Sequence, residues 1–566
     1  AYLFIPQNAT KDTPAPGVVT IEGWYNNKEM QDLYSIELAR RGYVVLALDL
    51  HSHGDSESLS IAELYDGAVG VDGAVQLIAS LPYVDTARIG VTGHSSGGTA
   101  ANMAVEIDNS RETPLIAAVL QQAGDWQDDT GGDHSGDYGS RSVGIIASTH
   151  DDFYFGTYDD AGNMLTNPAA FMETDGAKKF LNFNEDGFAG IAEGGKYYTR
   201  DFDGKTAYRV IYRPNMIHPL VAFSTTCVGY AVDFFDTTLG APKPLPASDQ
   251  IWPIKAVFNS LGVIGLLIFM VSFTLVLLDT PVFSALRSGE IVQPAPVQDS
   301  GAKAWYWVLL IIGAVFSGSS FLFCMNTVYS KTTNFFVQTG PLTIGTWAAL
   351  CGVFAIFCSA VFYGAYGKKH GWSARRAGLY LNLEQLWKTI ALAVIVIVVS
   401  FGLVFAAHYF FQVDYRMYVV AFKTFGADKV LIALRYLPFF LLFYVMNSIS
   451  ANCFNYNTIG GKNGNILIFA FFNALGAIFV VASQYIYFYA TGYQLYGLTE
   501  GQRIGPIWLF PCMVLLFVTP IMSRIIYKRT RNPYIAGLIN AMFIVMISCS
   551  NTTTILGGGE LIATTF

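Results

Sequence analysis

Short apolar runs alternate with helical patterns through the first 240 residues of the chain. Near-continuous apolar runs bounded by turn residues are typical of strands in a parallel sheet, since both faces of such a sheet are covered. The predicted strands are 16–21, 43–49, 89–92, 115–120, 143–149 and 208–212. The helical patterns between and after them lie near 63–81, 168–180 and 220–235. This alternation predicts an α/β fold with a doubly wound sheet.

From residue 256 onward the pattern changes to long apolar runs. Each run is long enough for the hydrocarbon core of a bilayer, which takes about 20 helical residues. The predicted spans are 256–278, 305–326, 344–366, 388–411, 430–450, 465–490, 507–525 and 533–555. We therefore predict an α/β domain over 1–240, a linker over 241–255, and an all-α polytopic transmembrane domain of about eight helices over 256–566.

The charges divide at the same place. Residues 1–250 hold 15 Lys and Arg against 34 Asp and Glu, a net charge of −19, whereas residues 251–566 hold 19 against 8, a net charge of +11. The acidic half has no basic stripe, so no nucleic-acid partner is expected. The bilayer itself is the expected partner of the second half, and no protein partner is indicated.

Basic residues in the short loops predict the orientation of the chain in the membrane. Loops on the side opposite the first domain carry twelve Lys and Arg, against five in loops on the same side. Because the more basic side normally faces the cytoplasm, we expect an integral protein of the cell membrane whose first domain is extracytoplasmic. Such a domain needs an export signal, so we also expect a leading segment ahead of Ala1.

A nucleophile motif follows the third predicted strand. Gly93-His94-Ser95-Ser96-Gly97 matches G-x-S-x-G directly after a strand and directly before a helical stretch. In this setting the serine sits on a tight, strained turn that lifts its hydroxyl above the sheet, and small neighbours avoid clashes with strand and helix. The motif predicts that Ser95 is a nucleophile.

Residues 1–236 resemble an α/β-hydrolase of the dienelactone-hydrolase and acyl-peptidase type. The strand followed by Gly23-Trp24, the segment from Asp49 to Ser56, and the motif around Ser95 lie in the order of that family. The resemblance implies the α/β-hydrolase fold for the first domain and does not extend to the apolar half.

The resemblance also implies an acid and a histidine later in the chain, in the order Ser, acid, His. His218 follows the last predicted strand, as the general base of such a triad should. Asp151 and Asp152 both follow the strand at 143–149. The family's pattern at this point favours Asp151, and Asp152 stays the alternative acid.

The remaining implied groups are the donors of an oxyanion hole, the backbone N–H groups of Ser96 and Trp24. The chain departs from many relatives at Glu22, where they have histidine. A carboxylate near the oxyanion would oppose negative charge unless it points away or is paired. No spacing of histidines, cysteines or acids indicates a metal site, and we expect no cofactor.

These features predict a membrane-anchored serine hydrolase that cleaves an ester or acyl bond of a lipid or other membrane-associated substrate. Two alternatives stay open. One is an acyltransferase that uses the same acyl-enzyme, and the other is a non-catalytic transport or assembly protein with a hydrolase-like domain.

Overall fold

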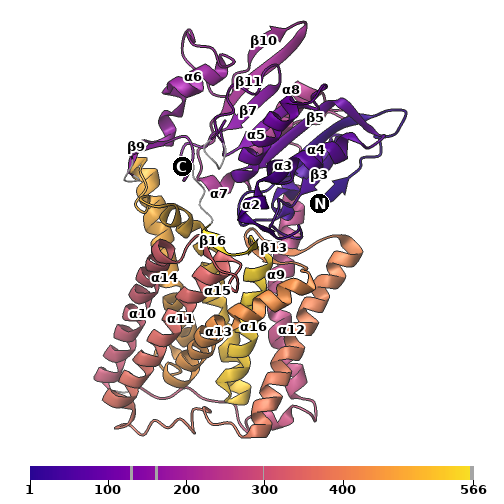
Figure 1. Cartoon of the computed structure of the whole chain (residues 1–566). Helices are drawn as coiled ribbons and strands as arrows, with labels where there is room; N and C mark the ends of the chain where they lie inside the picture. Colours follow the sequence, from indigo (N-terminus) through magenta and orange to yellow (C-terminus); the bar gives the residue numbers. More distant parts are fainter. Residues whose placement is uncertain (128–131, 160–162, 298, 561–566) are drawn as a thin grey trace.

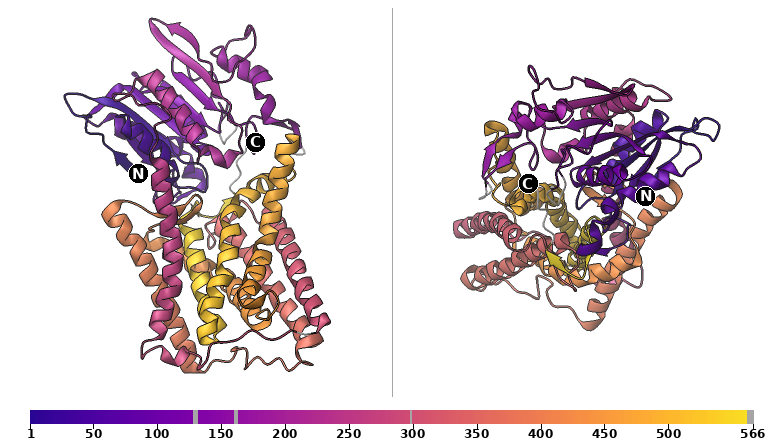
Figure 2. Two further views of the ribbon diagram at one scale, coloured as in Figure 1. Left: turned by 180° about the vertical axis from the view of Figure 1, so that it is seen from behind. Right: turned by 45° about the horizontal axis from the view of Figure 1, so that its top comes forward.

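The computed structural model describes residues 1–127, 132–159, 163–297 and 299–560. The chain forms two stacked parts (Figure 1). We call the part from β1 to α8 (Thr225–Leu239) the sheet domain, and the part formed by α9 to α16 the helix bundle. The sheet domain sits on one end of the bundle, and the bundle helices run roughly side by side beneath it (Figures 1 and 2).

An eight-stranded sheet organises the sheet domain, with strand order β1-β3-β2-β5-β6-β7-β11-β10. The six inner strands are parallel, and the edge strands β1 and β10 are antiparallel to their neighbours. The strands are β1 (Tyr2–Phe4), β2 (Ala15–Ile21), β3 (Val44–Leu48), β5 (Val84–His94), β6 (Ile116–Gln122), β7 (Ser142–Ile146), β10 (Tyr198–Phe202) and β11 (Lys205–Tyr212). All six inner strands coincide with runs predicted from the sequence.

Helices cover both faces of this sheet. Neighbouring residues of a strand point to opposite faces, so Val19 packs in the core beneath α4 and α5 while Val18 packs in the core beneath α1 and α8. The helical segments of the sheet domain are η1 (Lys28–Gln31), α1 (Asp32–Arg40), α2 (Ile61–Leu64), α3 (Asp66–Val69), α4 (Val71–Ala79), α5 (Ser96–Asn109), η2 (Pro168–Glu173), α6 (Asp175–Leu181), α7 (His218–Val221) and α8 (Thr225–Leu239). The predicted doubly wound α/β-hydrolase fold is confirmed.

Three of the predicted helices of this domain are each divided. The helix expected at 63–81 is interrupted at Gly67 and Gly70, which have φ of 57° and 92°, and Ala68 between them has φ of 55°. Left-handed backbone conformations of this kind cost glycine little and end a helix. The other two expected helices begin with the short segments η2 and α7, ahead of α6 and α8.

Within the described residues, eight helices are long and apolar enough to cross a membrane, the number predicted from the sequence. They are α9 (Trp252–Leu278), α10 (Ser300–Thr327), α11 (Thr339–Phe362), α12 (Leu383–Phe411), α13 (Ala427–Ile449), α14 (Gly461–Thr491), α15 (Glu500–Thr530) and α16 (Pro533–Ser550). Most of these helices begin before the span predicted for them or end after it. Arg524, counted above with the loop cations, lies inside α15 and is buried against Asn452 and Asn465.

Short strands join the two parts. β15 (Ile555–Leu556), which follows α16, pairs in parallel with β4 (Leu59–Ser60) of the sheet domain. Just before it, the Thr554 N–H donates to Ser52 O at 2.8 Å, and the Thr553 hydroxyl lies 2.9 Å from His53 Nε2. The remaining short strands are β8 (Thr157–Tyr158), β9 (Met164–Thr166), β12 (Lys331–Thr332), β13 (Tyr415–Met417), β14 (Val420–Phe422) and β16 (Gly559–Glu560).

Candidate active site

Ser95 occupies the sharp turn between β5 and α5. Its backbone has φ of 55° and ψ of −125°, a strained conformation for a residue with a side chain. The turn closes against backbone: a Cβ on Gly93 would lie 2.2 Å from the Gly97 carbonyl carbon, and a Cβ on Gly97 would lie 2.3 Å from Glu22 O. The two glycines therefore permit the close approach that holds Ser95 above the end of the sheet.

His218 and Asp151 come together although they are far apart in the sequence. His218 is the first residue of α7, and its Nδ1 lies 2.9 Å from Asp151 Oδ1 and 3.0 Å from Oδ2. An ionised carboxylate only accepts hydrogen bonds, so Nδ1 carries the proton and Nε2 is left as the basic nitrogen. The Asp151 carboxylate also accepts the N–H groups of Phe153 and Tyr154 and the hydroxyl of Ser148, each at 2.9–3.0 Å. These bonds fix the carboxylate behind the imidazole.

Asp152 has a different environment from Asp151. Its Oδ2 accepts the backbone N–H of His218 at 3.2 Å, so it does not face the imidazole edge that Asp151 holds. Complete burial raises the pKa of Asp152 well above its ordinary value, and the charge of Asp151 raises it further. The shift favours the protonated form of Asp152, whereas the geometry pairs Asp151 with the imidazole.

Ser95 and His218 line one cavity of about 250 Å³. In the described part of the chain, no hydrogen bond joins the Ser95 hydroxyl to the His218 ring. Bonds of this kind are often long in unliganded enzymes and tighten when substrate binds. His94 contacts the backbone of His218, because its Nε2 lies 3.2 Å from the carbonyl oxygen of His218. Burial lowers the pKa of His94 to about 3, as does the neighbouring His218, so His94 is neutral.

The two predicted oxyanion donors lie at the same cavity. Ser96 is the first residue of α5, and the N–H groups of a first helical turn have no partner within the helix. Trp24 follows Gly23, where a Cβ would lie 2.9 Å from His94 O and 3.2 Å from Ser95 Cβ. The turn at Trp24 is thus pressed against the turn at Ser95, and both Trp24 and Ser96 line the cavity with Ser95.

Glu22 does not oppose an oxyanion at this site. Its side chain is fully buried and its Oε1 accepts the N–H of Leu50 at 2.8 Å. Burial raises the pKa of Glu22 well above its ordinary value, and the neighbouring charge of Asp49 adds to the increase. The shift favours the uncharged form of the carboxyl group, and Glu22 does not line the cavity.

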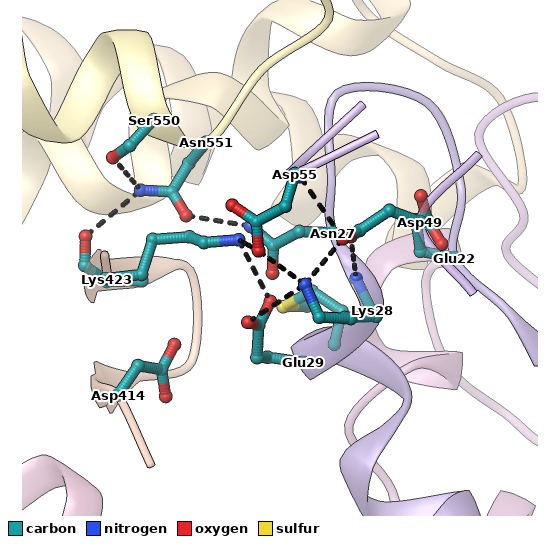
Figure 3. A network of polar contacts seen from close by, with 12 residues as sticks. Glu22, Asn27, Lys28, Glu29, Asp49, Asp55, Asp414, Lys423, Ser550 and Asn551 are labelled. Carbon is teal, nitrogen blue, oxygen red and sulfur yellow. Dashed lines mark hydrogen bonds and ion pairs between the residues drawn. The ribbon is translucent and has the colours of Figure 1, made fainter. Parts of the chain in front are cut away.

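A network of buried charges lies behind the turn at Trp24 (Figure 3). Lys28 Nζ lies 2.5 Å from Asp49 and 2.6 Å from Asp55. Lys423 reaches the same cluster from the segment after β14 of the helix bundle, 3.3 Å from Glu29 and 3.6 Å from Asp55. Burial alone would raise the pKa of Glu29, but the charges of Lys423 and Lys28 outweigh it and hold that pKa below its ordinary value.

Amide groups and a further ion pair continue the same network across the two parts. The Asn27 amide donates to Asn551 Oδ1 at 2.8 Å and accepts from the Arg416 guanidinium at 2.8 Å. Arg416 in turn lies 2.7 Å from the Asp414 carboxylate. Side chains from β13, from the segment after β14 and from the end of α16 therefore hold the segment that follows Trp24. Lys423 and Asn551 are seen beside Asn27 and Glu29 in Figure 3.

We expect Lys423→Met to destabilise the protein by about 3 kcal/mol or more, because it leaves the buried Glu29 carboxylate without one of its cations. Thermal unfolding of the purified protein in detergent checks this, with Lys331→Met as the control. Lys331 lies on the same side of the bundle and is exposed. Equal melting temperatures for the two variants would show that the network adds nothing to stability.

The helix bundle also contacts the loops that hold the acid and the histidine. The Gln494 side chain, between α14 and α15, donates to the backbone carbonyl of Asp152 at 2.7 Å. Tyr418, between β13 and β14, donates to the carbonyl of Pro219 at 2.7 Å. The bundle thus meets both loops directly beside the paired imidazole and carboxylate.

Side chains of the helix bundle complete the walls of the cavity. Residues of α10, α11, α13, α15 and α16 line it together with the turns at Trp24 and Ser95. The sequence did not identify these residues as part of the site, because their only local signal is the apolar pattern of a long helix. Among the described residues, no group of three or more His, Cys, Asp or Glu is arranged to hold a metal ion.

Comparisons with known proteins agree with the fold of the sheet domain. The sequence model of the Alpha/beta hydrolase family matches residues 17–244. No curated protein sequence matches the chain. Among solved structures, 2,6-dihydroxy-pseudo-oxynicotine hydrolase is 15% identical with a TM-score of 0.28, and the match covers 43% of this chain and 66% of that one.

Two further solved structures match the same part of the chain. Dienelactone hydrolase from Anabaena variabilis is 14% identical with a TM-score of 0.27, covering 42% of this chain and 90% of that one. TT1662 from Thermus thermophilus is 16% identical with a TM-score of 0.28, covering 42% and 93%. The sequence model of the Alpha/beta hydrolase family thus matches the sheet domain, and in the described part of the chain eight helices long and apolar enough to cross a membrane follow it.

Proposed function

We propose that the chain is a membrane-anchored serine hydrolase that cleaves an ester or acyl bond of a lipophilic, membrane-associated substrate. The observation that carries this proposal is the cavity shared by Ser95 and His218, whose walls continue from the sheet domain into the helix bundle. A water-soluble substrate would need no such walls. Apolar helices beside the nucleophile favour a substrate that reaches the site from the bilayer.

The chemistry follows from the geometry of the paired groups. His218 Nε2 takes the proton of the Ser95 hydroxyl as the oxygen attacks the acyl carbon, and Asp151 stabilises the imidazolium that forms. The N–H groups of Ser96 and Trp24 face the negative charge of the tetrahedral intermediate. Collapse of the intermediate releases the alcohol, which takes the proton from His218. Water then attacks the acyl-enzyme by the same route and regenerates Ser95.

The distribution of basic loop residues supports an outward-facing sheet domain at the cell membrane. In that orientation the substrate is an ester of the outer leaflet or of a molecule attached to it. The bilayer is then both the anchor and the source of substrate.

A fluorophosphonate that carries a fluorophore tests the proposal, because it reacts only with an activated serine. We expect wild-type protein to be labelled, Ser95→Ala to be unlabelled, and Ser110→Ala to be labelled like wild type. Ser110 is exposed at the far end of α5 and serves as the matched control. Absence of labelling in folded wild-type protein, or equal labelling of Ser95→Ala, would overturn the proposal.

A further inference from the structure

The cavity at Ser95 extends along one face of α11. The residues of α11 that line it are Gly340, Pro341, Ile344, Trp347, Ala348 and Cys351. Spacings of three and four residues place side chains on one face of a helix. At 1.5 Å per residue, the distance along the helix axis from Gly340 to Cys351 is about 16 Å. The cavity therefore has a limb that continues well below the site.

One face of α15 lines the same limb. Its lining residues include Ile504, Trp508, Cys512 and Leu516, again at spacings of four. α11 and α15 both begin at the end of the bundle that meets the sheet domain. Near these beginnings, the Tyr329 hydroxyl bonds to Glu500 of α15 at 2.5 Å and lies 3.2 Å from the Tyr25 hydroxyl of the sheet domain. Higher numbers along both helices thus mean greater depth in the bundle.

The chemistry of the walls changes with depth. Charged and ionisable lining residues lie at the level of the sheet domain: His94, His218, Arg416 and Glu500. Below them, the lining residues of the described chain are apolar, aromatic, cysteine or uncharged polar side chains, with Phe443, Leu516 and Ile544 among the deepest groups. A charged or strongly polar ligand would lose its hydration there without compensation. A hydrocarbon chain has no polar groups whose hydration would be lost there.

We propose that this limb binds the acyl chain of a long-chain ester, with the ester carbon at Ser95 and the chain directed down between α11 and α15. This inference rests on the proposed function and names its substrate class. The limb lies among helices that are each long enough to cross a hydrocarbon core of about 30 Å. An acyl chain bound there would therefore have apolar surroundings like those it has in lipid.

The test uses two phosphonofluoridates that inactivate serine hydrolases and differ only in the group that replaces the acyl chain, methyl or dodecyl. We expect wild type to react much faster with the dodecyl reagent. Ala348→Trp places an indole across the limb and should lower the dodecyl-to-methyl ratio of inactivation rates at least tenfold. Each methylene that loses apolar contact weakens binding by about fourfold, so loss of two or more suffices.

Ala360→Trp is the matched control, because Ala360 lies on the same helix, is exposed and does not line the cavity. It should keep the wild-type ratio. Two further variants protect the test against misfolding of Ala348→Trp. Ala348→Leu should lower the ratio less, and Cys351→Phe, about one helical turn deeper, should shift the limit of accepted chains to greater length in a graded reagent series.

Three results would overturn the acyl-chain assignment. The dodecyl-to-methyl ratio of inactivation rates could be near one in wild type, or it could be unchanged in both Ala348→Trp and Ala348→Leu. The third is that the variants at positions 348 and 351 have the same limit of accepted chain length. A preference that follows the length of the alkoxy group instead would overturn it too. All of these outcomes still require a reactive Ser95, so they leave the proposed function standing. Loss of reaction with both reagents in wild type would instead contradict the proposed function itself.

Discussion

Asp151→Asn should lower kcat/KM for ester hydrolysis by about 10⁴-fold, whereas Asp152→Asn should change it less than about fivefold. Asp151 Oδ1 lies 2.9 Å from His218 Nδ1 and accepts its proton in a hydrogen bond. An amide in its place can present its NH₂ group to the ring, favouring the tautomer in which Nε2 carries the proton and no longer accepts one from Ser95. Initial rates with a chromogenic ester measure both variants.

Asp152 is the matched control because it is adjacent, equally buried and chemically identical. Its raised pKa favours the neutral form, and asparagine keeps an oxygen that can accept the hydrogen bond from the His218 N–H. A large loss in Asp152→Asn with a small loss in Asp151→Asn would reverse the assignment of the acid. Similar large losses would show that the two carboxyl groups act as a unit.

Gly97→Ala should cost about 3 kcal/mol or more in stability and abolish labelling of Ser95. The new methyl group would lie 2.3 Å from Glu22 O and 2.8 Å from Ile21 O, both backbone atoms at the end of β2. Backbone atoms cannot rotate away, so the turn must separate from the strand and overpacking strain results. Thermal unfolding and fluorophosphonate labelling measure the two effects.

Gly73→Ala is the control of opposite sign. Gly73 lies inside α4, where a Cβ would meet nothing within 4 Å. Alanine in the interior of a helix is favoured over glycine by roughly 0.5–1 kcal/mol, so this variant should melt at or slightly above the wild-type temperature. Wild-type melting and labelling of Gly97→Ala would contradict the close packing described for the turn.

Local patterns were sufficient to predict the sheet domain. A parallel strand buried on both faces has a distinctive apolar run, and each of the six inner strands has one. The strand–turn–helix context located Ser95, and the strand ends at 149 and 212 located Asp151 and His218. The structure brings these three residues to one cavity, although their catalytic roles stay predictions.

Two features of the sheet domain required the structure. The family resemblance favours Asp151 over Asp152, but only the structure shows which way each side chain turns after the strand. Glu22 appeared unfavourable for an oxyanion hole because its neighbours were unknown. Burial beside Asp49 favours its uncharged form, and the Leu50 N–H holds the side chain away from the cavity; both arise from tertiary packing.

The shared cavity and the charge network could not be predicted from the sequence. Each depends on contacts between residues hundreds of positions apart, such as Lys423 with Glu29 or Asn551 with Asn27. Helical periodicity shows which residues of a span share a face, but not whether that face meets lipid, another helix or a cavity. A uniformly apolar helix such as α11 leaves this choice entirely open.

The pairing of β15 with β4 has a consequence for the order of events on the ribosome. The loop of Ser52 and His53 is synthesised early, but its partners Thr553 and Thr554 emerge only after α16. At about 5–20 residues per second, the interval is on the order of tens of seconds. The pairing cannot form during this interval, so that part of the surface of the nascent sheet domain stays uncovered until the segment after α16 has been synthesised.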